Sequence, residues 1–526
     1  MDPQKTNGVV ERDKKDVKRS KNQKSTPISQ LTREELEARL MQVEAHNKQL
    51  QNLLAKSQGI AVETAKIRKE RPFDFSKYSK RHVLLKFAYL GWDYNGFAVQ
   101  EDTPLTIEAQ IFHALLKTRL IESRETSNYH RCGRTDKGVS GFDQVISITL
   151  RSRLTSGIGV IVGDEKPAGC VDDDDQEIGY VMLLNKVLPP EIRMLAWCPV
   201  AVGFSARFDC SHRTYKYFFP RGNLDIKLMN EAAQHLVGSH DYRNFCKMDV
   251  GNGVVNFCRR ILKIHICEVG EDIKKTFEVE NTTAEDSSIH SSNDVERSLT
   301  FSHMGSSSST ETKGGEIPDG YDMCVATLEG QAFLWHQVRA IMAILFLVGE
   351  RKENPSIVQE LLDVDKYPRK PQYCLASDVP LNLYGTTFEG VAWQWDLEVL
   401  KSVISQLQAL WTQNSVRTTM IRRMLWDLES RYKDLSKGFT STASIECSEN
   451  VTAPGAQVLR QYIPQDQCET LVSGARTKVY RPLLSRPTCE SLETRVEHYV
   501  KRQRLDPDIL QRLTSSDASV VVDNSS

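Results

Sequence analysis

Residues 129–141 concentrate the side chains of this chain whose types and spacing could do chemistry. Their sequence, YHRCGRTDKGVSG, holds one carboxylate, Asp136, close to the basic side chains of Arg131, Arg134 and Lys137. Nearby positive charge favours the ionised form of a carboxyl, so we expect Asp136 to be ionised. Glycines on both sides of it predict a tight turn whose backbone can come close to a ligand. On local chemistry alone, a reactive carboxylate and a charged surface hairpin are equally supported.

The elements around this stretch predict a turn held between β-strands. Residues 145–150 follow it directly with strand alternation, and residues 82–89 form a second predicted strand. A glycine-rich turn at 91–97 comes next, and residues 106–121 carry apolar side chains at helical spacing. Asp136 is therefore expected to lie where a helix returns the chain to a sheet.

Two later segments add a tyrosine and an arginine. Residues 213–219 alternate at strand period, which points Tyr215 and Tyr217 to the same face. Arg339 directly precedes the apolar residues 340–348, which predict a buried helix. Because an unpaired buried charge is strongly destabilising, Arg339 needs a carboxylate or a phosphate as its partner.

The charge of the chain is unevenly distributed. The 526 residues carry a net charge of −1, but residues 162–178 hold seven acids and one base, and residues 271–320 hold eleven acids and four bases. The rest of the chain has 63 basic and 51 acidic side chains, an excess of twelve positive charges. That excess suits a polyanionic partner such as RNA.

Metal, disulfide and membrane chemistry find little support. The twelve cysteines form no CxxC pair and no Cys/His cluster at zinc spacing, so no structural metal is expected. No signal peptide is recognised, which makes the reduced thiols of an intracellular protein the default expectation. The longest apolar run, residues 340–348, is less than half of the ~20 residues that span a bilayer.

The run Gly133–Ser140, GRTDKGVS, resembles the signature of the TruA-type tRNA pseudouridine synthases, in the form typical of eukaryotic members. Other family motifs are matched in the same order along residues 80–395. They are Y-x-G-x-x-Y-x-G at Tyr89–Gly96, F-x-A-R-F at Phe204–Phe208, R-x-Y-x-Y at Arg213–Tyr217, G-x-H-D-F with tyrosine at its last position at Gly238–Tyr242, and F-L-x-H-x-V-R at Phe333–Arg339. One departure is Asp378-Val379-Pro380, which stands where the family usually has glycine-leucine.

The resemblance implies roles for individual residues. Asp136 would be the catalytic residue, Arg339 its ion-pair partner, and Tyr215 the active-site tyrosine that stacks on the base and assists proton removal at C5. Substrate binding would involve Arg134, Lys137, Arg131 and Tyr215, with Arg134 filling the space that the flipped uridine vacates. Asp136 could attack C1′ of the ribose or C6 of the ring, or remove a proton from C2′, and the sequence does not choose among these routes.

The resemblance also implies the fold and the substrate. The expected fold is α+β, with two related sheet-plus-helix halves around a basic catalytic cleft. Within the family, the chain is most similar to eukaryotic members that convert uridine to pseudouridine at positions 38 and 39 of the tRNA anticodon arm. This isomerisation needs neither a nucleotide cofactor nor a metal, and family members form homodimers.

The chain divides into five predicted regions. A basic, disordered tail spans 1–29, and a short helix with heptad spacing that could form a coiled coil spans 30–70. The catalytic halves are expected at 71–224, with an acidic loop at 152–178, and at 225–395, with a disordered insert at 271–320. Residues 396–526 are a C-terminal extension, helical over 397–429 and near 484–504. The lysines and arginines of the tail suggest nuclear localisation, with a cytoplasmic pool also compatible.

Three other functions compete with this interpretation. A catalytically silent tRNA-binding or tRNA-folding protein on the same scaffold would not need Asp136, Tyr215 and Arg339 together. An aspartyl phosphotransferase would need a second carboxylate and Mg²⁺ near Asp136, where Lys137-Gly138 stands instead. A coiled-coil scaffold would depend on the N-terminal heptads alone.

Overall fold

The computed structural model describes most of the chain between residues 73 and 502. The described ranges are 73–162, 176–273, 320–440, 471–472 and 479–502, together with Arg39, Met41, His46 and Gln49, which are helical and exposed. By its internal contacts the chain divides into two units, Met1–Phe73 and Asp74–Ser526. The predicted tail, nearly all of the heptad segment and most of both acidic segments lie outside the described residues.

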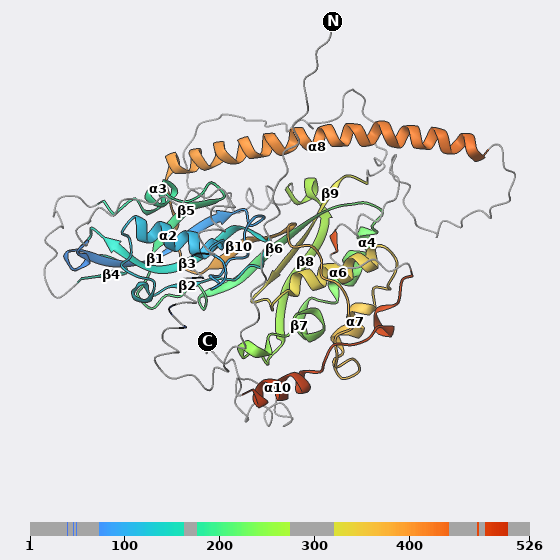
Figure 1. Cartoon of the computed structure of the whole chain (residues 1–526), viewed down its shortest axis with the longest axis horizontal. Helices are drawn as coiled ribbons and strands as arrows, with labels where there is room; N and C mark the ends of the chain where they lie inside the picture. The colour runs from blue at the N-terminus through green and yellow to red at the C-terminus, as the bar shows by residue number, and fades with distance from the viewer. Residues whose placement is uncertain are drawn as a thin grey trace, which may run out of the picture. The chain divides into compact units, whose positions relative to one another are not determined.

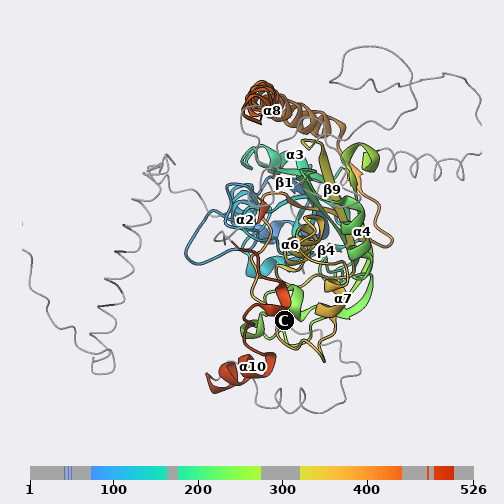
Figure 2. The same ribbon diagram turned by 90° about the vertical axis from the view of Figure 1, so that its right-hand side faces the viewer.

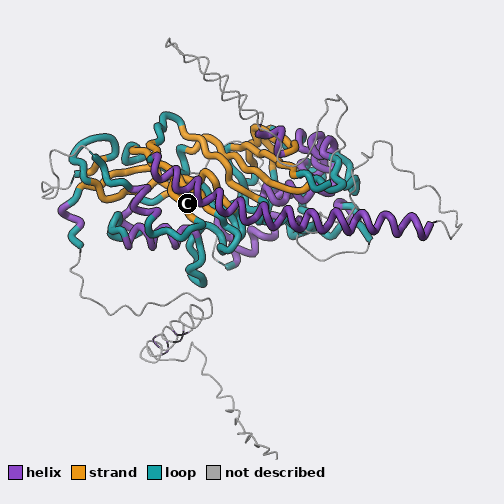
Figure 3. Tube along the Cα trace, turned by 90° about the horizontal axis from the view of Figure 1, so that it is seen from above, coloured by secondary structure: helices purple, strands orange, loops and turns teal. Residues whose placement is uncertain are grey.

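Eleven strands form one mixed sheet in the second unit (Figure 1). In chain order they are β1 Ser79–Tyr89, β2 His130–Arg131, β3 Ser140–Ser152, β4 Val160–Ile161, β5 Ile192–Pro199, β6 Cys210–Pro220, β7 Gly238–Asp241, β8 Cys258–Glu268, β9 Met323–Gly330, β10 Leu381–Phe388 and β11 Gln394–Trp395. The spatial order is β11-β5-β1-β3-β10-β6-β9-β8-β7, with β2 beside β3 and β4 beside β1. Figure 3 shows these strands as one continuous layer with helices alongside.

The centre of the sheet is a join between two sets of strands. β3 and β10 pair in parallel, with Asn382 opposite Ser140 and Leu383 opposite Gly141, whereas the other pairings are antiparallel. On its other side β10 pairs with β6, so a strand from late in the sequence lies between two strands from earlier in the sequence. The join begins four residues after Asp136, which places the turn that carries Asp136 at the middle of the sheet.

Seven helices of at least six residues are described. They are α2 Ile107–Lys117, α3 Tyr180–Asn185, α4 Ile226–Gln234, α6 Gln337–Gly349, α7 Ile357–Leu362, α8 Leu397–Thr440 and α10 Leu492–Lys501. The side chain of Thr106 caps α2 by accepting a hydrogen bond from the backbone of Ala109. None of the described helices is both long enough and apolar enough to cross a membrane.

Separate apolar cores lie on the two sides of the join. Strands β1, β3 and β5 pack with α2 and α3 in one core. Strands β6, β8 and β9 pack with α4, α6 and α7 in the other. α4 lies against both α6 and β8, as Figures 1 and 2 show. This helix-and-sheet arrangement confirms the α+β fold class, while the domain boundaries remain predictions.

α6 is buried on almost every side, as its sequence predicts. Among its thirteen residues only Arg339 and Leu347 are not fully buried. The residue before it, His336, has a positive φ of 62°, an unusual backbone conformation for a side chain that is not glycine. His336 therefore does not have the extended backbone of a standard helix N-cap.

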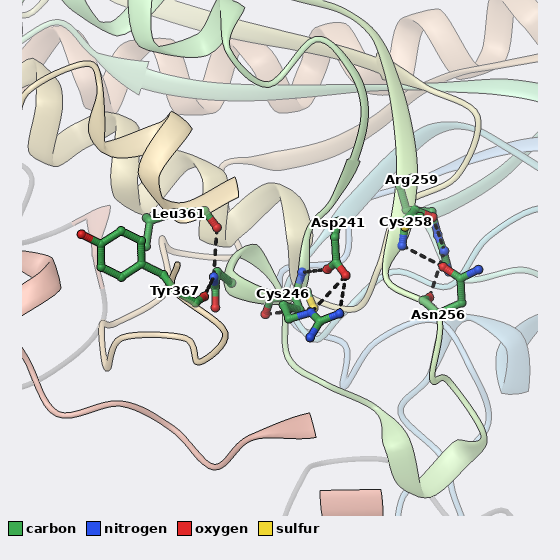
Figure 4. A network of polar contacts seen from close by, with 9 residues as sticks. Asp241, Cys246, Asn256, Cys258, Arg259, Leu361 and Tyr367 are labelled. Carbon is green, nitrogen blue, oxygen red and sulfur yellow. Dashed lines mark hydrogen bonds and ion pairs between the residues drawn. The ribbon is translucent and has the colours of Figure 1, made fainter. Parts of the chain in front are cut away.

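Polar contacts hold the segment Gly238–Phe245 against the second core (Figure 4). Asn244 is buried and donates its side-chain amide to the carbonyls of Leu361 and Tyr367. Arg243 pairs with Asp241 at 2.6 Å. The imidazole of His240 contacts the Val237 carbonyl at 3.0 Å, a local hydrogen bond.

Candidate active site

The turn that carries Asp136 is fixed by the glycine-rich turn at 91–97. The backbone of Phe97 donates to the Thr135 carbonyl at 3.0 Å, and Gly138 donates to the Tyr94 carbonyl at 3.2 Å. The two turns approach so closely that a Cβ on Gly91 would lie 1.9 Å from the Val139 carbonyl oxygen. Only glycine fits there, so these backbones determine where the carboxylate points.

Three side chains from the start of α6 face the Asp136 carboxylate. The indole N–H of Trp335 donates to Oδ1 at 3.0 Å. The Oδ2 atom lies 3.5 Å from Nε2 of His336 and 3.9 Å from Nη1 of Arg339. Arg339 thus forms the predicted ion pair with Asp136, at a distance too long for a direct hydrogen bond.

The sequence predicts that neighbouring positive charges determine the ionisation of Asp136. The structure corrects this, because burial affects the pKa of Asp136 more than those charges do. Burial is the largest influence and raises the pKa of Asp136 above the usual aspartate range, while Arg339 and the Trp335 N–H act in the opposite direction. Arg134 also lowers the pKa, but it is the smallest of the named influences. The nearby charges counted from the sequence are outweighed by desolvation in the folded protein.

Arg339 contacts two carboxylates and a carbonyl. Its Nε donates to the Ala376 carbonyl at 2.8 Å, and its Nη2 lies 3.9 Å from Oδ2 of Asp378. Asp378 is the residue at which the chain departs from the family pattern, and its negative charge raises the pKa of Asp136. The departure therefore places a second acid on Arg339.

The two tyrosines of β6 have different surroundings. Tyr215 lines the same cavity as Asp136 and packs edge-on against Phe333, with ring centroids 5.0 Å apart. Tyr217 is fully buried in the second core, and its hydroxyl donates to the Ser377 carbonyl. Burial raises the pKa of Tyr215 well above its usual range, so its hydroxyl stays protonated at neutral pH.

The predicted basic contacts separate into two groups. Arg134 and Lys137 are exposed and line the cavity. Arg131 instead pairs at 2.6 Å with Glu108, a fully buried carboxylate that also accepts from the hydroxyl of Tyr129. The described structure therefore brings Arg131 to a buried acid of α2 and not to the cavity lining.

The cavity is open and has a volume of about 670 Å³. Its walls come from the turn at 91–97, the turn at 133–139, β6 and the segment that starts α6. Within the described parts of the chain, no group of three or more His, Cys, Asp or Glu side chains is arranged to hold a metal ion. The group formed by Asp136 with Trp335, His336 and Arg339 is part of this lining.

Two residues of this group were not singled out from the sequence. Trp335 occupies an unspecified position of the F-L-x-H-x-V-R pattern, and His336 occupies a specified one without an assigned role. Burial together with the positive charges of Arg339 and Lys247 lowers the pKa of His336 to about 4. His336 is thus neutral at pH 7, and the positive φ that aims it at Asp136 is visible only in the folded chain.

Comparison with known proteins gives consistent results. A family model described as tRNA pseudouridine synthase matches residues 232–389, which include Arg339. The chain is 44% identical over 439 residues to the tRNA pseudouridine(38/39) synthase of Bos taurus, covering 83% of this chain and 80% of the relative. It is 42% identical over 473 residues to the Homo sapiens protein of the same name, covering 89% and 85%.

A more distant relative covers a shorter region. The tRNA pseudouridine(38/39) synthase of Saccharomyces cerevisiae is 41% identical over 329 residues, or 62% of this chain and 61% of the relative. The two mammalian alignments extend over more than two thirds of each chain at well above 30% identity. This chain therefore belongs to the family of tRNA pseudouridine synthases.

Proposed function

We propose that this protein isomerises uridine to pseudouridine at positions 38 and 39 of the tRNA anticodon arm. The observation that carries the proposal is the carboxylate of Asp136, held against Arg339 in a cavity that Tyr215 also lines. The names of the relatives from cattle, human and yeast support the choice of positions. No cofactor or metal takes part in the proposed reaction.

The reaction breaks the N1–C1′ bond, turns the detached uracil and joins it to the ribose through C5. Asp136 acts as a nucleophile at C1′ or C6, or as a base at C2′, and each role requires the ionised carboxylate. Arg339 favours that form and, through its bond to the Ala376 carbonyl, is itself fixed in place. Tyr215, whose hydroxyl stays protonated, stacks on the uracil and assists removal of the C5 proton to solvent by orienting the ring, while N1 takes up a proton in exchange.

The target uridine has to leave the base stack to reach Asp136. Flipping costs a few kcal/mol, which contacts to the rest of the tRNA offset. Arg134 and Lys137 are exposed at the cavity and are placed to meet the phosphates or to fill the vacated space. Affinity then depends mainly on the shape and backbone of folded tRNA.

We also propose a homodimer, and α8 supports it. This helix is anchored at its start by Val399 and Val403 and again near Glu429, which accepts a hydrogen bond from Tyr321. Between and beyond these anchors it exposes large apolar side chains at spacings of three, four, seven or ten residues, namely Ile404, Leu407, Trp411, Ile421, Leu428, Tyr432 and Leu435. Such spacing fits the same helix of a second copy. Analytical ultracentrifugation of wild type and of Trp411→Glu/Leu428→Glu tests this, since an unchanged sedimentation coefficient would contradict it.

Nuclear localisation, with a cytoplasmic pool, is a further proposal that rests on the basic residues of the tail at 1–29. A reporter fused to these residues should accumulate in the nucleus, and the same fusion with its lysines and arginines replaced by glutamine should not. Equal distribution of the two fusions would refute the proposal.

Pseudouridine mapping in tRNA tests the catalytic proposal. Purified protein should modify positions 38 and 39 of unmodified tRNA transcripts, whereas the Asp136→Ala protein should bind the same tRNA and modify nothing. Binding without modification by the wild-type protein would favour the silent tRNA-binding alternative. Modification by the alanine variant would remove Asp136 from its role.

A further inference from the structure

The two oxygens of the Asp136 carboxylate are held unequally. Oδ1 accepts a well-formed hydrogen bond from the indole N–H of Trp335, at 3.0 Å. Oδ2 has only longer contacts, 3.5 Å to His336 and 3.9 Å to Arg339. A hydrogen bond to an ionised carboxylate is directional, so it fixes the position of Oδ1. Oδ2 accepts no such hydrogen bond and is therefore the oxygen that is free to react with the substrate.

The indole of Trp335 is itself fixed from behind. The ammonium of Lys247 lies 4.0 Å from the centroid of the Trp335 ring, an attractive cation–π contact. The backbone of Lys247 also donates to the Trp335 carbonyl at 2.9 Å. The ring nevertheless remains 40% exposed and lines the cavity. A side chain that serves only the core would not be left open to the substrate in this way.

We propose that Trp335 is a positioning residue, whose N–H fixes Oδ1 of Asp136 so that Oδ2 meets the flipped uridine. The inference rests on the proposed isomerase function and applies to each chemical route, because attack at C1′, attack at C6 and proton removal at C2′ all use one carboxylate oxygen. It also gives a role to a position that the family motif leaves unspecified. Rotation of the carboxylate about its terminal bond is soft, so an oxygen without a partner would not hold this orientation.

The N–H also bears on the ionisation of Asp136. The other groups that face this carboxylate are Arg339 and Arg134, which favour the ionised form, Asp378, which opposes it, and the neutral His336. Removing the Trp335 donor while leaving all of these in place raises the pKa of Asp136 further. The acid limb of the pH–rate profile, where activity is lost by protonation, should then move to higher pH.

Two substitutions separate the N–H from the ring. Trp335→Phe keeps an aromatic ring under Lys247 but has no donor, and Trp335→His places an N–H where the pyrrole edge of the indole was. The matched control is Trp393→Phe, because Trp393 also lies under an ammonium, that of Lys86 at 4.5 Å, and is outside the cavity lining. Each protein is measured by single-turnover pseudouridine formation from pH 5 to 9, by tRNA binding and by thermal unfolding.

The phenylalanine variant should turn over about tenfold or more slowly at neutral pH, the effect of losing one hydrogen bond to a charged group. Its acid limb should move to higher pH, with tRNA affinity changed by less than about twofold. The histidine variant should recover most of the rate above neutral pH, and Trp393→Phe should match wild type.

Equal rates and equal pH profiles for wild type and Trp335→Phe would overturn the inference. So would equal defects in the phenylalanine and histidine variants, because the ring and not the N–H would then matter. If Trp335→Phe does not fold, Trp335→His becomes the test. A Trp335→His protein that folds but turns over as slowly as Asp136→Ala would then overturn the inference. An inactive wild-type protein would refute the proposed function and not this inference alone.

Discussion

Replacing Arg339 by methionine tests the centre of the site. Methionine retains an unbranched apolar stem of similar length and removes the guanidinium, so packing along α6 is largely kept. The charges of Arg339 and Asp136 lie 3.9 Å apart, with side chains 11% and 23% exposed. At an effective dielectric constant of ~20, Coulomb's law gives about 4 kcal/mol for this separation as a ceiling. If that stabilisation is needed in the transition state, the rate falls by up to about a thousandfold.

The assay is single-turnover pseudouridine formation with saturating protein, which keeps product release out of the measured rate. Arg339→Met should lose activity by two to three orders of magnitude on this estimate, with tRNA affinity changed only a few-fold. Arg339→Lys keeps the charge but cannot contact Asp136, Asp378 and the Ala376 carbonyl together, so its stability should exceed its activity.

Thermal unfolding provides the second measurement for Arg339. The methionine variant leaves Asp136 and Asp378 without their shared cation, so its unfolding temperature should fall. The fall should be larger at higher pH, because Arg339 favours the ionised form of Asp136. A methionine variant that reacts within tenfold of wild type and unfolds at the wild-type temperature would refute the ion-pair reasoning.

Four other outcomes are expected. Asp136→Asn should abolish modification yet raise the unfolding temperature at neutral pH, because a carboxyl whose pKa is raised by burial destabilises the fold when it is ionised. This gain in stability should vanish as the pH falls below the usual carboxyl range, and a variant less stable than wild type at neutral pH would contradict the reasoning. Asp378→Asn should lower the pKa of Asp136 and move the acid limb of the single-turnover profile to lower pH, and a shift the other way would refute the role of its charge. Activity on prefolded tRNA should survive EDTA, and a persistent metal requirement would reopen hydrolase-like chemistry. Deleting residues 274–319 should preserve pseudouridine formation and tighten tRNA binding slightly in low salt, because the deletion removes negative charge. Loss of activity with an intact circular dichroism spectrum would instead place this segment in the RNA site.

The positions of the strands and of the main site residues follow from local sequence. Strand alternation predicts β1, β3 and β6 to within a few residues. The apolar run after Arg339 predicts a buried helix and hence a partner for that arginine, and the fold brings it to Asp136. Helix ends are less predictable, and α8 continues to Thr440 although only residues 397–429 were expected to be helical.

Interactions between distant segments could not be predicted in the same way. Arg131 is five residues from Asp136 in the sequence, but its partner is Glu108, from a helix that the local pattern did not connect to it. The raised pKa of Asp136 depends on the amount of protein packed around the carboxyl, which no count of neighbouring charges contains. Trp335 and His336 both contact Asp136 at the turn where His336 has a positive φ, a backbone conformation that the sequence does not indicate.

The position of β10 in the sheet has a consequence for biosynthesis. Until Leu381–Phe388 has left the ribosome, the edge of β6 that pairs with β10 has no partner strand, and neither has the Ser140–Gly141 end of β3. Asp136 is translated early, but Arg339 and the closing strand are translated some 200 to 250 residues later, estimated from their places in the sequence. Truncated translation products that stop before β10 therefore leave the β6 edge open, which makes them candidates for chaperone binding.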